Sequence, residues 1–149
     1  MFQRIVVGLD GSQVSETALR MGAELARRLD VPLHLVRVAD LAVVHWGATQ
    51  AAAAYAELSG EMIREKEKAA HYLETVEEPL RDEGLQVTTE VRSGLAAREL
   101  ADAAGPGDLL VVASQGRHGL ERILLGSVAD EVAERSRASV LIARETNGR

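Results

Sequence analysis

Short, continuous apolar runs recur along this chain and are rich in Val, Ile and Leu. Runs of this kind predict strands that are buried on both faces of a sheet, because a half-exposed strand would alternate polar and apolar positions. The predicted strands are residues 2–9, 33–39, 85–91, 109–113 and 139–143.

Between these runs, apolar residues recur every three or four positions, which is the spacing of one helix face. The first helix carries this pattern at Val14, Ala18, Met21, Leu25 and Leu29. A long helix later in the chain carries it at Ala69, Leu73, Val76 and Leu80, and shorter helices are expected over residues 95–104 and 127–136. Strands that alternate with helices predict an α/β domain: an open, five-stranded parallel sheet with helices on both faces.

One segment does not fit this alternation. Residues 41–60 are too many for a simple connection between a strand and a helix. The segment holds Trp46, the single tryptophan, and an alanine run at 51–54. An extra helical turn or a loop that covers a sheet edge would explain it structurally. A mobile lid over the carboxyl ends of the strands would explain it functionally.

Composition narrows the function classes. The 149 residues fit a single domain over 1–149 with a substantial core. The absence of cysteine excludes disulfides and thiolate chemistry, and a net charge of −6 disfavours nucleic acid and anionic membranes as partners. No apolar run approaches the roughly 18 residues of a membrane span, and the N-terminus shows no signal-peptide pattern. We therefore expect a cytoplasmic protein.

The fourth predicted strand leads into a glycine-containing loop that ends at a helix N-terminus, Gly126-Ser127. Glycines let backbone N–H groups approach a ligand closely, and the free N–H groups of a helix start favour an anion such as phosphate. Arg117, His118 and Arg122 add local positive charge. The alternative is that the glycines only turn the chain and that Ser127 only caps the helix.

The first predicted strand ends in Gly8-Leu9-Asp10. In an open parallel sheet, ligands bind outside the carboxyl ends of the strands, at the point where the strand order reverses. If the first and fourth strands are neighbours there, their loops border one crevice. Asp10 would then offer a carboxylate to an amine or a hydroxyl group, although it could equally cap the following helix.

Three separated blocks of sequence resemble the universal stress protein family. The family's loop pattern is Gly-x-x-Gly, nine residues, then Gly-Ser or Gly-Thr. Here Gly116, the nine residues 117–125 and Gly126-Ser127 fit that spacing. The run 123–128 is also similar, as are residues 4–12 at the start and Ser139–Ala143 near the end. The resemblance covers essentially the whole chain except residues 41–60.

The resemblance implies a Rossmann-like sheet of order 3-2-1-4-5 and, in one branch of the family, ATP bound at the crevice, with Mg or Mn. Asp10 and Val38 match the adenine and ribose end, and the phosphate end is matched by the loop and the helix that follows. Ala113 departs from the pattern, because the family has its first glycine there. Alanine is disfavoured if that position needs a positive φ and tolerable if it is strand-like. The candidate cofactor-binding residues are Gly8, Asp10, Val38, Ala113, Gly116, Arg117, Gly126, Ser127 and Val128.

Several other classes lack their motifs in this chain. A receiver domain needs an acidic pair after the first strand and an Asp after the third, and a P-loop needs a Gly-Lys-Ser/Thr run. No dinucleotide fingerprint and no nucleophile elbow is present. Of the histidines, His118 is the one near the phosphate loop, whereas packing or solvent exposure is expected for His34 and His71.

These observations favour a nucleotide-binding regulatory or sensor protein of a stress response, acting on an unidentified protein partner. A slow ATPase or autophosphorylating enzyme is the alternative, although we can name no catalytic residue and no metal ligand. A dimeric interaction module that binds no nucleotide is the third. In each case we expect a homodimer through Ser139–Ala143, because this short apolar strand would lie unprotected at a sheet edge and because many members of the family pair there.

Overall fold

The computed structural model describes residues 1–10, 13–40, 51–114 and 127–145. Five strands and four helices alternate along this part of the chain. The strands are β1 (Arg4–Leu9), β2 (Leu33–Asp40), β3 (Val87–Gly94), β4 (Asp108–Ala113) and β5 (Ser139–Ala143). The helices are α1 (Gln13–Leu29), α3 (Ala51–Asp82), α4 (Ala96–Ala103) and α5 (Ser127–Arg135).

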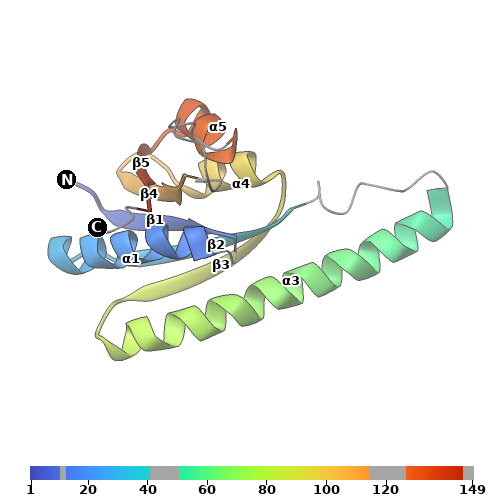
Figure 1. Cartoon of the computed structure of the whole chain (residues 1–149), viewed down its shortest axis with the longest axis horizontal. Helices are drawn as coiled ribbons and strands as arrows, with labels where there is room; N and C mark the ends of the chain where they lie inside the picture. The colour runs from blue at the N-terminus through green and yellow to red at the C-terminus, as the bar shows by residue number, and fades with distance from the viewer. Residues whose placement is uncertain (11–12, 41–50, 115–126, 146–149) are drawn as a thin grey trace.

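The strands form one parallel sheet in the order β3-β2-β1-β4-β5, as the family resemblance implied. Helices α1 and α3 cover one face, and α4 and α5 cover the other (Figure 1). Alternate residues of each strand point to opposite faces. Thus Val7 packs under α1 and α3, whereas Val6 packs under α4 and α5. The strand order reverses between β1 and β4, which creates the switch point of the fold.

The core explains why the strand sequences are continuously apolar. Both faces of β1, β2 and β4 are covered, so residues of either parity are buried. The largest fully buried side chains are Ile5, Leu33, Leu35, Leu73 and Leu110. No helix in the described ranges is long and apolar enough to cross a membrane.

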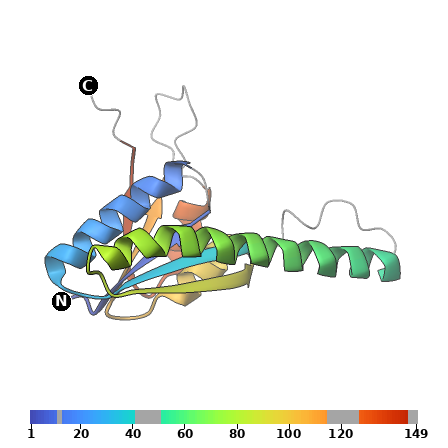
Figure 2. The same ribbon diagram turned by 90° about the horizontal axis from the view of Figure 1, so that it is seen from below.

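The structural alternative of extra helix in the segment 41–60 is confirmed for the second half of the segment, although this helix is continuous with the long helix that follows. Residues 51–60 form the first turns of α3, which is 32 residues long and, at about 1.5 Å per residue, spans roughly 48 Å. Among the residues of α3 whose burial is described, the first buried one is Ala69, and the N-terminal half of the helix extends past the sheet (Figures 1 and 2). The interpretations of residues 41–50, including Trp46, lie outside the described residues.

The third strand also begins later than the apolar pattern predicted. It runs from Val87 to Gly94 rather than over 85–91, in register with the whole of β2. The Leu85 N–H group instead bonds to Leu80, where it closes the end of α3, and Gly84 adopts a positive φ of 92°. Because β3 is an edge strand, its polar residues are tolerated, and the apolar run was a poor guide to its ends.

Candidate functional site

The carboxyl ends of β1 and β4 meet at the switch point, and most of the described candidate residues lie around it. Asp10 directly follows β1 and is exposed. Leu9 pairs with Arg37, so Asp10 and Val38, the next residue of each segment, lie at the same level of the sheet. Val38 is half-buried and packs on the α4 side. An exposed carboxylate beside an aliphatic side chain can hold the polar edge and the face of a base.

Ala113 is the last residue of β4 and pairs with Ala143 of β5. The next N–H group, that of Ser114, donates to the Ala143 carbonyl at 2.9 Å. Among the described non-glycine residues, only Asp30 has a positive φ, so Ala113 is strand-like. The methyl group therefore causes no backbone strain, and the departure from glycine is tolerated at this position.

Helix α5 starts at the same end of the molecule as the carboxyl end of β4. Ser127, its first residue, is exposed, and Val128 packs into the core on the α4 side. Free N–H groups at this helix start can bind an anion, although Asp130 in the first turn reduces the local positive field. Gly116, Arg117, His118 and Gly126 lie outside the described residues, so the loop between β4 and α5 stays a prediction.

Gly8 occupies a different kind of position. It is buried within β1, and a Cβ atom there would lie 2.9 Å from a methyl carbon of Leu100 and 3.3 Å from Val112. The glycine therefore allows α4 to pack closely on the sheet behind the crevice. This packing role does not depend on a ligand.

A cluster that the sequence analysis missed lies beside Asp10, under α1 and α3. The Arg37 guanidinium carbon sits 4.7 Å from the ring centre of Tyr72, a cation–π contact between β2 and α3. The Tyr72 hydroxyl is buried close to Ser15. Burial raises the pKa of Tyr72, and the carboxylate of Glu16 raises it further, against the opposing charge of Arg37. An arginine inside the apolar run 33–39 was the sequence signal for this cluster.

A second polar network lies on the α4 face. The buried His34 bonds through Nδ1 to Thr88 at 2.7 Å and through Nε2 to Glu90 at 2.9 Å. Arg92 then bridges Glu90 and Glu99, each at 2.9 Å. Burial opposes ionisation of Glu90, but the bonds to His34 and Arg92 outweigh it and hold the pKa of Glu90 below its ordinary value. His34 is thus a packed, hydrogen-bonded residue, and His71 is exposed on α3, as expected.

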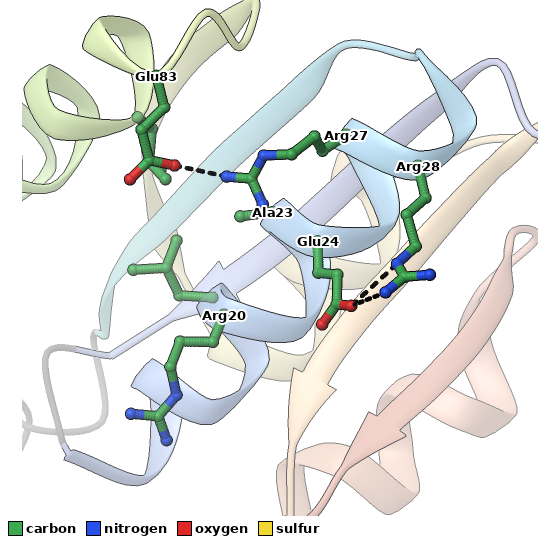
Figure 3. Close-up of a pocket in the computed structure, with 8 residues that line it drawn as sticks. Arg20, Ala23, Glu24, Arg27, Arg28 and Glu83 are labelled. Atoms are coloured by element: carbon green, nitrogen blue, oxygen red, sulfur yellow. Dashed lines mark hydrogen bonds and ion pairs between the residues drawn. The ribbon is translucent and has the colours of Figure 1, made fainter.

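The described residues contain no group of three His, Asp or Glu side chains that could hold a metal ion. A hollow lies between α1 and α3 (Figure 3). It is lined by six residues of α1 between Leu19 and Arg28 and, at the end of α3, by Leu80 and Glu83. None of these is a candidate residue of the predicted crevice.

The chain was compared with known proteins. The model of the universal stress protein family matches residues 1–144. Universal stress protein MJ0531 of Methanocaldococcus jannaschii is 32% identical over 149 residues, covering 97% of this chain and 84% of that protein. Universal stress protein YxiE of Bacillus subtilis is also 32% identical, over 97% of this chain and its own full length.

Solved structures share the fold. The protein MJ0577 superposes with a TM-score of 0.79 at 23% identity, with 99% of each chain covered. A universal stress protein in complex with cAMP gives a TM-score of 0.64 at 23% identity, covering 97% of this chain and 98% of that one. A universal stress protein of Archaeoglobus fulgidus in complex with dAMP gives 0.60 at 21%, covering 95% and 98%.

Proposed function

Because this chain belongs to the universal stress protein family, we propose that it is a nucleotide-binding regulatory protein that holds ATP at the β1/β4 switch point. The observation that carries the proposal is the convergence of Asp10, Val38, Ala113 and the start of α5 at one end of the sheet. The family members solved with cAMP and dAMP support a nucleotide as the ligand class.

The candidate residues fall into two groups, one for each end of the bound nucleotide. Asp10 and Val38 would hold the base and ribose, since a carboxylate accepts hydrogen bonds from amino and hydroxyl groups and Val38 offers an aliphatic surface. Ser127 and the N-terminal N–H groups of α5 would hold the phosphates, together with Gly116, Arg117, Gly126 and Val128. Mg²⁺ or Mn²⁺ would enter with the phosphates.

A regulatory role fits better than rapid catalysis. The histidine on the described strands, His34, is buried and bonded to Thr88 and Glu90, away from the strand carboxyl ends. The ligand state would instead be passed on to a partner protein. Tight binding with negligible turnover would support this role, whereas sustained release of ADP at a high rate would support the enzyme alternative.

The binding experiment compares wild type with Gly116→Val and Ser127→Ala. ATP with Mg²⁺ at about 100 times its Kd should stabilise the wild-type fold by roughly 2.7 kcal/mol. Gly116→Val should lose this stabilisation, because its branched side chain fills the space through which N–H groups reach phosphate. Ser127→Ala should bind more weakly and lose about 1 kcal/mol of helix capping. No thermal shift of the wild type in millimolar ATP would contradict the proposal and favour a module that binds no nucleotide.

We also propose that the active form is a homodimer paired through β5. This strand is the outer strand beside β4 in the sheet order, and its apolar residues Val140, Leu141 and Ile142 are only partly buried. Pairing of two such edges about a two-fold axis would satisfy their backbone groups and close the assembly.

A further inference from the structure

Two helical stripes of opposite charge lie on the layer formed by α1 and α3. Arg20, Arg27 and Arg28 are exposed on α1, with Glu24 between them. Glu74, Glu78 and Asp82 are exposed on α3 at intervals of four residues, which places them on one helix face. Each stripe extends over eight residue-to-residue steps of its helix, or about 12 Å. We call them the basic stripe and the acidic stripe.

A groove of about 480 Å³ lies between the two helices, and the residues of the basic stripe line its α1 side (Figure 3). Its apolar residues are Leu19, Ala23 and Leu80. Arg27 reaches across the groove to Glu83, which ties the last turn of α1 to the end of α3. The two stripes are therefore level with each other, at the same end of the layer.

The arginines of the basic stripe are available for new partners. The side chains of the Arg27–Glu83 pair are 49% and 54% exposed, and those of Arg28–Glu24 are 74% and 58% exposed. Exposed pairs of this kind are worth little, so exchanging one carboxylate for another costs little. Within the described ranges, Arg20 reaches only the Thr17 hydroxyl, at 3.5 Å. Arginine is well suited to a second carboxylate because its planar fork matches carboxylate geometry.

We propose that this layer docks against the same layer of a second copy of the chain, with the basic stripe of each copy along the acidic stripe of the other. Helices α1 and α3 run in the same direction, since both return from a parallel strand to the start of the next (Figures 1 and 2). A two-fold axis that lies in the interface plane, along the helices and midway between them, therefore sets α1 parallel to the partner's α3 and at the same level. The same operation repeats the contact on the other side.

Charge complementarity indicates that the docking partner is a second copy of this chain. The acidic stripe has the length, the sign and the level that the basic stripe requires, and it belongs to this chain. An unrelated acidic segment would match only one stripe, whereas a second copy satisfies both. The groove residues Leu19, Ala23 and Leu80 would lie near the axis and supply its apolar part. The strand β5 stays free, because it lies at the sheet edge beyond α1.

The association should be modest and sensitive to salt. Strong interfaces have cores that are depleted in charged residues, and this face is mostly charged. The screening length falls from about 10 Å at about 0.1 M salt to about 3 Å at about 1 M. The weight-average mass should therefore decrease between these two conditions, whatever further association β5 provides.

Sedimentation of purified protein at the two salt concentrations tests the proposal. One variant reverses the basic stripe (Arg20→Glu with Arg28→Glu), and another reverses the acidic stripe (Glu74→Lys with Glu78→Lys). Each should lose the salt-dependent gain in mass, because both stripes of the layer then repel their counterparts. An equimolar mixture should regain it, because the reversed stripes complement each other.

The matched control, Arg98→Glu with Arg135→Glu, changes charge equally on the exposed surface of α4 and α5 and should behave as wild type. Thermal melts establish that each variant folds, and Arg20→Gln with Arg28→Gln replaces the reversal if it does not. A wild-type mass that is independent of salt, or a mixture that stays unassociated, overturns the proposal. A loss of mass in the α4/α5 control equal to that in the stripe variants also overturns it.

Discussion

Replacing Gly22 with alanine should destabilise the protein, although alanine is the better helix former. Gly22 is buried in the middle of α1, against β1. By helix propensity alone, the change would stabilise the fold by about 1 kcal/mol. A Cβ atom at this position, however, would lie 2.3 Å from the Cγ2 methyl carbon of Val7.

The cost of overpacking decides whether Gly22→Ala stabilises or destabilises the protein. Ordinary carbon contacts need about 3.5 Å or more, so the helix or Val7 must move by roughly 1 Å. Val7 is fully buried in the central strand, so any movement must displace other core residues. Overpacking of this kind costs about 1–3 kcal/mol. We therefore expect a net loss of up to about 2 kcal/mol for Gly22→Ala, or up to about 8 °C in Tm for a domain of this size.

Urea unfolding followed by circular dichroism measures this loss. The slope of the unfolding free energy against urea concentration should be the same as in the wild type. The double variant Val7→Ala with Gly22→Ala removes the overlapping methyl group. It should be more stable than the sum of the two single changes implies, because the pair is coupled. A Gly22→Ala protein as stable as wild type, or more stable, would refute the reasoning, as would strict additivity in this cycle.

Two further predictions follow from the ion pairs and the sheet edge. Burial opposes ionisation of Asp108, but the bonds from Arg4 and from the Gly105 N–H group lower its pKa, as His34 and Arg92 lower that of Glu90. Their stabilisation is present above the unfolded pKa values near about 4 and is lost as the pH falls below them. Arg4→Met should therefore flatten the acid limb of a stability–pH curve, and an unchanged limb would contradict this account. Leu141→Lys should shift the protein toward monomers or insoluble material, because the lysine places a charge on the pairing strand β5. A wild-type protein that sediments as a monomer at tens of micromolar in high salt would exclude the β5 dimer.

The predicted site depended on the order of the strands, which the sequence supplied only through a family resemblance. The spacing of Gly116 and Gly126-Ser127 and the ends of the first and fourth strands were readable as local patterns. Their convergence was not, because periodicity reports which residues are buried and not which strands are neighbours. The structure brings Asp10, Val38, Ala113 and Ser127 to one end of the sheet. It also shows that Ala113 is strand-like, which the sequence left open.

The alternation of apolar runs with helical spacing was sufficient to predict the elements and the α/β class, because burial on both faces leaves a direct mark on each strand. The pattern failed to predict segments that are not buried on both faces. Residues 51–60 belong to a helix that extends beyond the core, and the polar residues of β3 lie at an edge. The contact of Arg37 with Tyr72, the network around His34 and the tight fit at Gly22 were decided by tertiary structure alone. Each joins residues from different elements, and the distance between two packed surfaces is not encoded in the pattern of either one.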